Sequence, residues 1–85
     1  MGFFKKKAGL KEFIENIARE LVDNPNQVTI DEKQRDRMTV LELRVGDGDL
    51  GKVIGRQGQT AKALRTLLAA ASARQGKKTT LEILE

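Results

Sequence analysis

Apolar residues recur along this chain with two periods, and each period predicts one kind of element. Between residues 10 and 21 they repeat every three or four positions, which is typical of one face of an amphipathic helix. The members of this face are Leu10, Phe13, Ile14, Ile17, Ala18 and Leu21. Asn24-Pro25-Asn26 then predicts a turn, because proline and asparagine interrupt a helix. The pattern therefore predicts a first helix over residues 10–21.

Alternation of apolar and polar residues predicts three strands. Residues 27–31 form a short alternating segment, and the charged run at 33–37 is expected to be a solvated connection. Residues 38–45 alternate more strongly and predict a second strand, which Gly46 ends. Residues 79–84 predict the third strand.

Two helices are predicted between the second and third strands. Asp49 is expected to cap a short helix that runs to Ile54. A longer helix is predicted over residues 60–74, with Gly76 in the left-handed C′ position after it. Its inward face is expected to consist of Ala61, Leu64, Leu67, Leu68 and Ala71. The order α-β-β-α-α-β predicts an α+β domain with a three-stranded mixed sheet and three helices on one face.

Length and composition restrict the class of protein. Eighty-five residues predict one domain at 10–85, preceded by a mobile basic tail at 1–9. The chain has no cysteine or histidine, and Ser72 is its only serine, so we expect neither a catalytic site nor a metal site, and no cofactor. No apolar run approaches the ~20 residues that span a bilayer, and the basic start lacks the apolar core of a secretory signal. The expected location is the cytoplasm, with no membrane partner.

Basic charge is concentrated in one segment. Residues 50–78 hold seven of the 16 basic residues and no acidic residue. The rest of the chain holds all 12 acidic residues and has a net charge of −3. A patch of one sign attracts polyanions, although a solvated helix face would give a similar run.

Three overlapping glycine patterns occur near this segment. Residues 46–51 match the G-x-G-x-x-G dinucleotide fingerprint, but Asp47 and Asp49 would face the pyrophosphate, and no acidic partner for the ribose follows about 20 residues later. Residues 46–52 nearly match a P-loop, but Val53 replaces the Ser or Thr that would bind magnesium. A dinucleotide-binding site and a P-loop are therefore both disfavoured.

The third pattern is Gly55-Arg56-Gln57-Gly58, which lies between two predicted helices inside the acid-free segment. Glycine lets the backbone approach a ligand closely, and the following helix start offers free N–H groups to a phosphate. Arg56 and Gln57 would project from the tip, and Lys62 and Arg65 would extend a cationic rim. The alternative is an ordinary connection between helices with glycines for tight turning.

The stretch 51–58 resembles the signature of a KH domain, and the element order resembles the bacterial, type II form. Residues 21–25, 39–43 and 61–67 are similar to the small stand-alone bacterial KH proteins of the KhpA family. The similarity covers residues 10–84. The basic tail and the glycine-rich loop at 46–48 depart from the family pattern, but neither touches the G-x-x-G loop.

The resemblance implies binding of single-stranded RNA, with about four nucleotides held between the loop, its two helices and a sheet edge. Gly55, Arg56, Gln57 and Gly58 would hold the RNA backbone. Lys52 would flank them, and Ile54 and Ala61 would offer apolar surface to bases or else belong to the core. With no Trp or Tyr, and no Phe after residue 13, we expect low sequence specificity and strong salt dependence.

The family resemblance also implies a role as an RNA chaperone or post-transcriptional regulator, self-association, and partnership with a larger KH-containing protein, KhpB. An alternative is a dimerising interaction module for which RNA is secondary. The alanine-rich run at 68–73 motivates it, because small side chains allow a partner to approach closely, although helix propensity explains the run as well.

Overall fold

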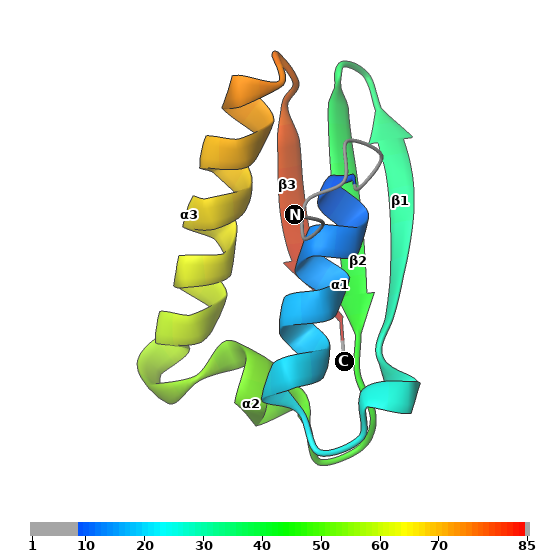
Figure 1. Cartoon of the computed structure of the whole chain (residues 1–85), viewed down its shortest axis with the longest axis vertical. Coiled ribbons are helices and arrows are strands. Elements are labelled where there is room, and N and C mark those ends of the chain that lie inside the picture. Colours follow the sequence, from blue (N-terminus) through cyan, green and yellow to red (C-terminus); the bar gives the residue numbers. More distant parts are fainter. Residues whose placement is uncertain (1–8, 85) are drawn as a thin grey trace, which may run out of the picture.

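The structure, a computed structural model, describes residues 9–84. The predicted basic tail lies outside this range except for Gly9. The elements, in chain order, are α1 (Leu10–Leu21), a 3₁₀ turn (Pro25–Gln27), β1 (Thr29–Arg35), β2 (Met38–Arg44), α2 (Leu50–Ile54), a second 3₁₀ turn (Arg56–Gly58), α3 (Gln59–Arg74) and β3 (Thr79–Ile83). The order of helices and strands predicted from the sequence is confirmed (Figure 1).

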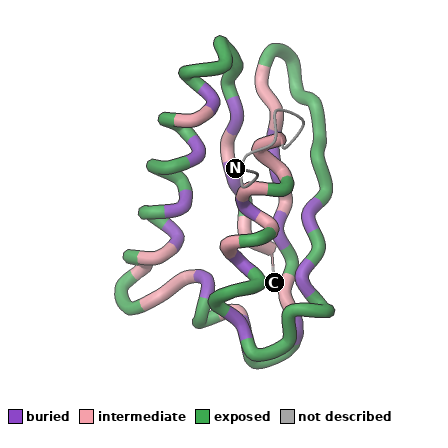
Figure 2. The backbone as a smooth tube through the Cα atoms, viewed as in Figure 1, coloured by how far each residue is buried: buried purple, intermediate pink, exposed green. Residues whose placement is uncertain are grey.

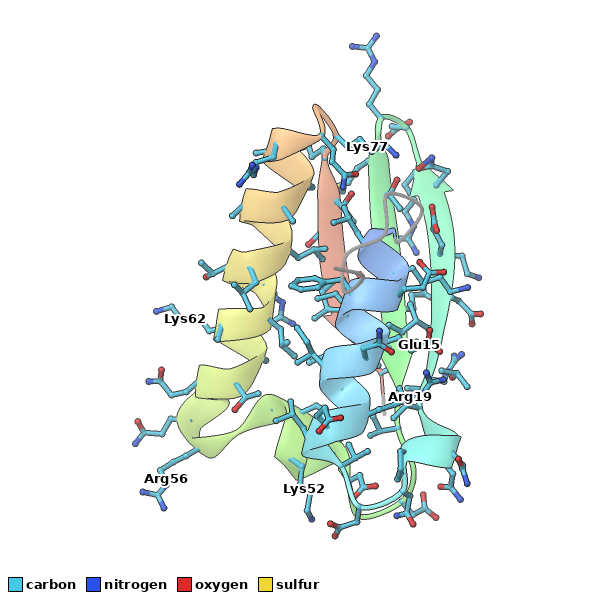
Figure 3. All side chains as sticks on the ribbon, in the orientation of Figure 1. Glu15, Arg19, Lys52, Arg56, Lys62 and Lys77 are labelled. Carbon is cyan, nitrogen blue, oxygen red and sulfur yellow. The ribbon has the colours of Figure 1, made fainter. Side chains whose placement is uncertain are left out.

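Helix α1 has the bounds that the periodicity predicts, and a local contact explains its start. The Glu12 carboxylate accepts a hydrogen bond from the Gly9 N–H at 3.2 Å and so occupies a free donor at the helix start. Near the other end, Arg19 pairs with Glu15 one turn earlier at 2.7 Å (Figure 3). The apolar face places Ile14 and Ala18 in the core.

The sheet has the order β1-β2-β3, with β1 antiparallel to β2 and β2 parallel to β3. The mixed sheet is thus confirmed. Because β2 is central, β1 and β3 are the two edge strands. The segment between the parallel strands is long enough to hold α2 and α3, as a parallel connection requires.

The prediction of a solvated connection at residues 33–37 was wrong. Strand β1 continues to Arg35, and only Asp36 and Arg37 turn the chain before β2 begins. Asp36 adopts a φ of 56°, which aspartate tolerates in tight hairpin turns. The charged residues belong to a strand because their backbone pairs with β2 as far as Arg35, opposite Met38. Their side chains stay exposed and reach across the sheet, with Lys33 4.0 Å from Glu42.

Helices α1 and α3 cover one face of the sheet, and the core lies between them and the strands (Figures 1 and 2). The core residues are Ile14, Ala18, Val22, Val28, Ile30, Leu41, Leu43, Val53, Leu64, Leu68 and Leu81. Burial of a single leucine or isoleucine side chain stabilises the fold by roughly 1.5–3 kcal/mol. The five-residue α2 packs against α1 and α3 and adds Val53 to this core.

Helix α3 agrees with its predicted bounds within one residue. Gly76 has a φ of 70°, and the N–H of Lys77 reaches the Ser72 carbonyl at 2.9 Å, so the predicted glycine ends the helix as expected. One predicted core residue was wrong, because the Leu67 side chain is 47% exposed. It lies on the flank of α3 away from Leu64 and Leu68, which are buried.

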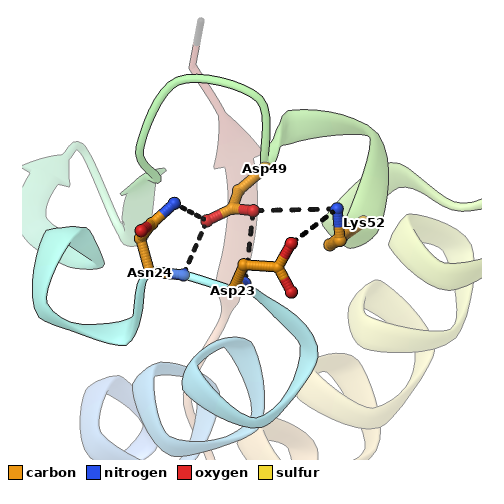
Figure 4. Close-up of polar contacts among 4 residues, drawn as sticks. All are labelled: Asp23, Asn24, Asp49 and Lys52. Carbon is orange, nitrogen blue, oxygen red and sulfur yellow. Dashed lines mark hydrogen bonds and ion pairs between the residues drawn. The ribbon is translucent and has the colours of Figure 1, made fainter.

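The carboxylate of Asp49 joins two segments that are 25 residues apart (Figure 4). It accepts hydrogen bonds from the backbone N–H groups of Asp23 at 3.2 Å and Asn24 at 2.9 Å. The Asn24 side-chain amide donates a third bond at 3.1 Å. Asp49 occupies the predicted N-cap position of α2, but its side chain bonds to the chain after α1 and not to α2 itself. The start of α2 is thereby fixed to the end of α1.

The pKa of Asp49 is lower than that of an ordinary aspartate. Burial of the carboxyl group raises its pKa, but the hydrogen bonds from Asp23 and Asn24, with the nearby positive charge of Lys52, outweigh this effect. Since the pKa in the folded state is below that in the unfolded state, the charged form stabilises the fold above about pH 4. That contribution is lost as the pH falls through the lower, folded-state value.

We predict that Asp49→Asn lowers the melting temperature at pH 7 by roughly 5–15 °C, because an amide nitrogen cannot accept the backbone bonds. The matched control is Asp47→Asn, which changes an exposed carboxylate in the same loop and should leave the melting temperature nearly unchanged. Thermal unfolding followed by circular dichroism from pH 7 to pH 2.5 should show the gap between wild type and Asp49→Asn narrowing below pH 4. A gap that is constant with pH would contradict the proposed role of the charge.

Candidate nucleic-acid interface

The loop between α2 and α3 begins at a glycine that no other residue can replace without movement. Gly55 has a φ of 78°, and its N–H closes α2 by bonding to the Gly51 carbonyl at 2.8 Å. A Cβ atom at this position would lie 2.3 Å from Thr60 Oγ1 and 2.8 Å from the Thr60 backbone nitrogen. The loop is therefore folded tightly against the first turn of α3.

The loop ends at a glycine with the opposite surroundings. Gly58 also has a positive φ, 77°, but a Cβ atom there would meet no atom within 4 Å. Between the glycines, Gln57 has a φ of 56°, which is uncommon outside glycine. The N–H groups of Gly58 and Gln59 donate to the carbonyl oxygens of Gly55 and Arg56, and among residues 9–84 no side chain caps the start of α3. This end of the loop can accept a ligand atom close to the backbone.

Arg56 and Gln57 are exposed at the tip, and Arg56 points away from the body of the protein (Figure 3). Within residues 9–84, Arg56 has no ion-pair partner. Its charge is thus available to an anion at the loop.

Lys52 lies on α2, directly before the loop, and pairs with two carboxylates. Its ammonium lies 3.3 Å from the Asp23 carboxylate and 3.9 Å from that of Asp49 (Figures 3 and 4). The negative charge of these two neighbours offsets the charge of Lys52. The sequence alone could not reveal this, because Asp23 is distant in the chain.

The two apolar candidates differ in exposure. Ile54 is half-buried and offers part of its side chain to the surface, whereas Ala61 is only 5% exposed. Of the two roles that the sequence left open for Ala61, its burial favours the core.

The two cations of the predicted rim on α3 also differ. Lys62 is exposed and extends away from the helix (Figure 3). Arg65 instead bridges α3 to the edge of the sheet, where its Nε donates a hydrogen bond to the Leu81 carbonyl oxygen at 3.3 Å. The sequence pattern gave no sign of this contact with β3.

Two further features of the described residues bear on the chemistry. None of their helices is long and apolar enough to cross a membrane. Over the same range, no three His, Cys, Asp or Glu side chains are grouped so that they could hold a metal ion.

A mixed three-stranded sheet, two long helices on one face, and a G-x-x-G loop between α2 and α3 define a KH domain. The comparisons with known proteins agree. A family model described as "KhpA/KhpB, KH domain" matches residues 11–83, and the chain belongs to this family.

Relatives match the chain over nearly their whole length. The "RNA-binding protein KhpA" of Aquifex aeolicus is 49% identical over 78 residues, covering 92% of this chain and 99% of its own. The protein of the same name from Clostridium perfringens is 45% identical over 75 residues, covering 88% and 100% respectively.

A solved structure shares the fold at low sequence identity. It is a crystal structure of an Aquifex aeolicus Era variant bound to GDP.AlF4-, with a TM-score of 0.57 and 23% identity. The match covers 87% of this chain but only 29% of that one. At this identity the likeness concerns the fold alone.

Proposed function

We propose that this protein binds single-stranded RNA through the loop Gly55-Arg56-Gln57-Gly58, as a binding protein and not an enzyme. The observation that carries the proposal is the open space beside Gly58, where α3 begins and a Cβ atom would meet nothing within 4 Å. Relatives that are 43–49% identical are named RNA-binding proteins, which supports RNA as the ligand. The setting we infer is the bacterial cytoplasm, with a role as an RNA chaperone or post-transcriptional regulator.

The proposed contact is between a phosphate of the strand and the backbone. The N–H groups of Gly58 and Gln59 already bond to loop carbonyls. The attraction therefore comes from the positive end of the dipole of the 16-residue α3, which the open space beside Gly58 lets a phosphate approach. Arg56 at the tip and Lys62 one turn into α3 add positive charge without an ion-pair partner among residues 9–84. Lys52 contributes less, because Asp23 and Asp49 already pair with it.

A backbone clamp of this kind holds phosphates and reads no base directly. The half-buried Ile54 offers one apolar surface to a base, and aromatic stacking is absent from this region because the last phenylalanine is Phe13. We therefore expect affinity to fall steeply with salt and to depend weakly on sequence.

The sharpest test places one negative charge at the clamp without changing its shape. Asp and Asn have the same size and both tolerate a positive φ, so we compare Gly58→Asp with Gly58→Asn. We predict that Gly58→Asp weakens binding to a pentauridine by at least about tenfold, because its carboxylate repels the phosphate, and Gly58→Asn by less than about threefold. Fluorescence anisotropy at fixed salt gives both dissociation constants.

Gly58 is preferred over Gly55 because a side chain at Gly55 would collide with Thr60 and disturb the fold. Melting curves of the two Gly58 variants should agree closely, which would separate binding from stability. If folded Gly58→Asp and Gly58→Asn bind RNA with equal affinity, the clamp mechanism is contradicted.

A second candidate function is a dimerising interaction module whose partner is a second copy or a KhpB-like KH protein. The exposed Leu67 favours it, since a 47% exposed leucine is flanked along α3 by the exposed Ala63 and Ala70. These residues lie at helical spacing on one side of α3, so a partner could approach its backbone closely.

For this second function, Leu67→Asp is predicted to shift the mass in solution from dimer to monomer. Leu21→Asp is the matched control, because Leu21 is 37% exposed but lies on α1. Light scattering coupled to gel filtration over a concentration series measures the mass. A wild-type protein that stays monomeric at millimolar concentration would exclude self-association through α3.

A further inference from the structure

Arg65 is held against the backbone of an edge strand. Among residues 9–84, strand β3 pairs with β2 alone, so one of its sides has no neighbouring strand there. The carbonyl of Lys78 and the N–H of Leu84 bond toward β2, and alternation along the strand turns the backbone groups of Leu81 outward. The Arg65 Nε donates to this outward Leu81 oxygen at 3.3 Å.

The position of Arg65 on α3 relates it to the loop. Gly58, Lys62 and Arg65 are spaced by four and then three residues, which puts them on one side of the helix. Arg65 lies two turns, roughly 10 Å, along the axis from Gly58. An RNA strand clamped at Gly58 and running along this side of α3 would bring a base to the guanidinium.

The hydrogen-bonding capacity of Arg65 is mostly unused. A guanidinium has five N–H donors and no acceptor, and the bond to Leu81 occupies one donor. Arg65 is exposed, and it forms no ion pair with a carboxylate in the part of the chain that the structure describes. With Nε bonded to Leu81, the planar group is held at one edge, and among residues 9–84 its two terminal nitrogens have no hydrogen-bond partner.

We propose that Arg65 reads a guanine base in the bound strand. Guanine offers O6 and N7 as paired acceptors that match an arginine fork, whereas adenine has an N6 amino donor in place of O6. The proposal rests on the RNA-binding function proposed above and adds a preference at one position of an otherwise unspecific strand. A phosphate would also fit an oriented fork, but it would give no preference for guanine over adenine, which is the quantity measured below.

The experiment uses the full-length protein and pentauridines in which one guanine, or one adenine, is placed at each position in turn. At the best position, wild type should bind the guanine strand about five- to tenfold more tightly than the adenine strand. Arg65→Lys keeps the charge but loses the fork, so it should make the two dissociation constants equal while changing the adenine value less than about twofold. Lys62→Ala is the matched control and should weaken both strands equally, leaving their ratio unchanged.

The outcomes separate this inference from the proposed function. If wild type binds all strands equally, or if Arg65→Lys keeps the guanine preference, Arg65 does not read a base, although RNA binding stands. If wild type binds no pentanucleotide, both proposals fail. Arg65→Gln, which also lacks the fork, serves as a second variant if Arg65→Lys has a lowered melting temperature.

Discussion

The buried carboxylate of Asp49 is the contact on which the placement of the loop depends. Its three hydrogen bonds from Asp23 and Asn24 fix the start of α2 to the chain that leaves α1. Helix α2 is only five residues long, too short to be stable alone, so its position comes from this contact and from Val53 in the core. A loop that follows a fixed α2 and precedes the 16-residue α3 has both of its ends held. The same carboxylate pairs with Lys52, which links the stability of the fold to the charge near the interface.

The two glycines of the loop have different physical roles. Gly55 allows the chain to pack against Thr60, where a Cβ atom would collide, and so makes the loop compact. Gly58 faces open space, so its missing side chain leaves room for a ligand beside the backbone. Conformations with positive φ at three of the four loop residues are held by the helices on either side. An anion site that is formed before the ligand arrives loses little entropy on binding.

Much of the fold could be predicted because the periodicity of apolar residues and the glycines at helix ends depend only on residues close together in the sequence. Periodicity gave α1 its bounds, and Gly76 marked the end of α3. The G-x-x-G loop was also recognisable. What could not be predicted depends on partners in other segments of the chain. These are the backbone pairing of the charged part of β1 with β2, the ion pair of Lys52 with Asp23, and the contact from Arg65 to Leu81. Leu67 was misplaced because its apolar character predicted burial, whereas the packing of α3 leaves it at the surface.

The central claim is that the loop backbone and the first turn of α3 form the contact with RNA. The most direct measurement is a titration of the ¹⁵N-labelled protein with pentauridine, followed by ¹H–¹⁵N correlation spectra. The account predicts that the amide signals of Gly58, Gln59 and Thr60 shift most, because these residues lie where the phosphate is proposed to bind. Largest shifts on the solvent-facing side of the sheet, around Lys33 and Arg44, with the loop signals unmoved, would contradict it.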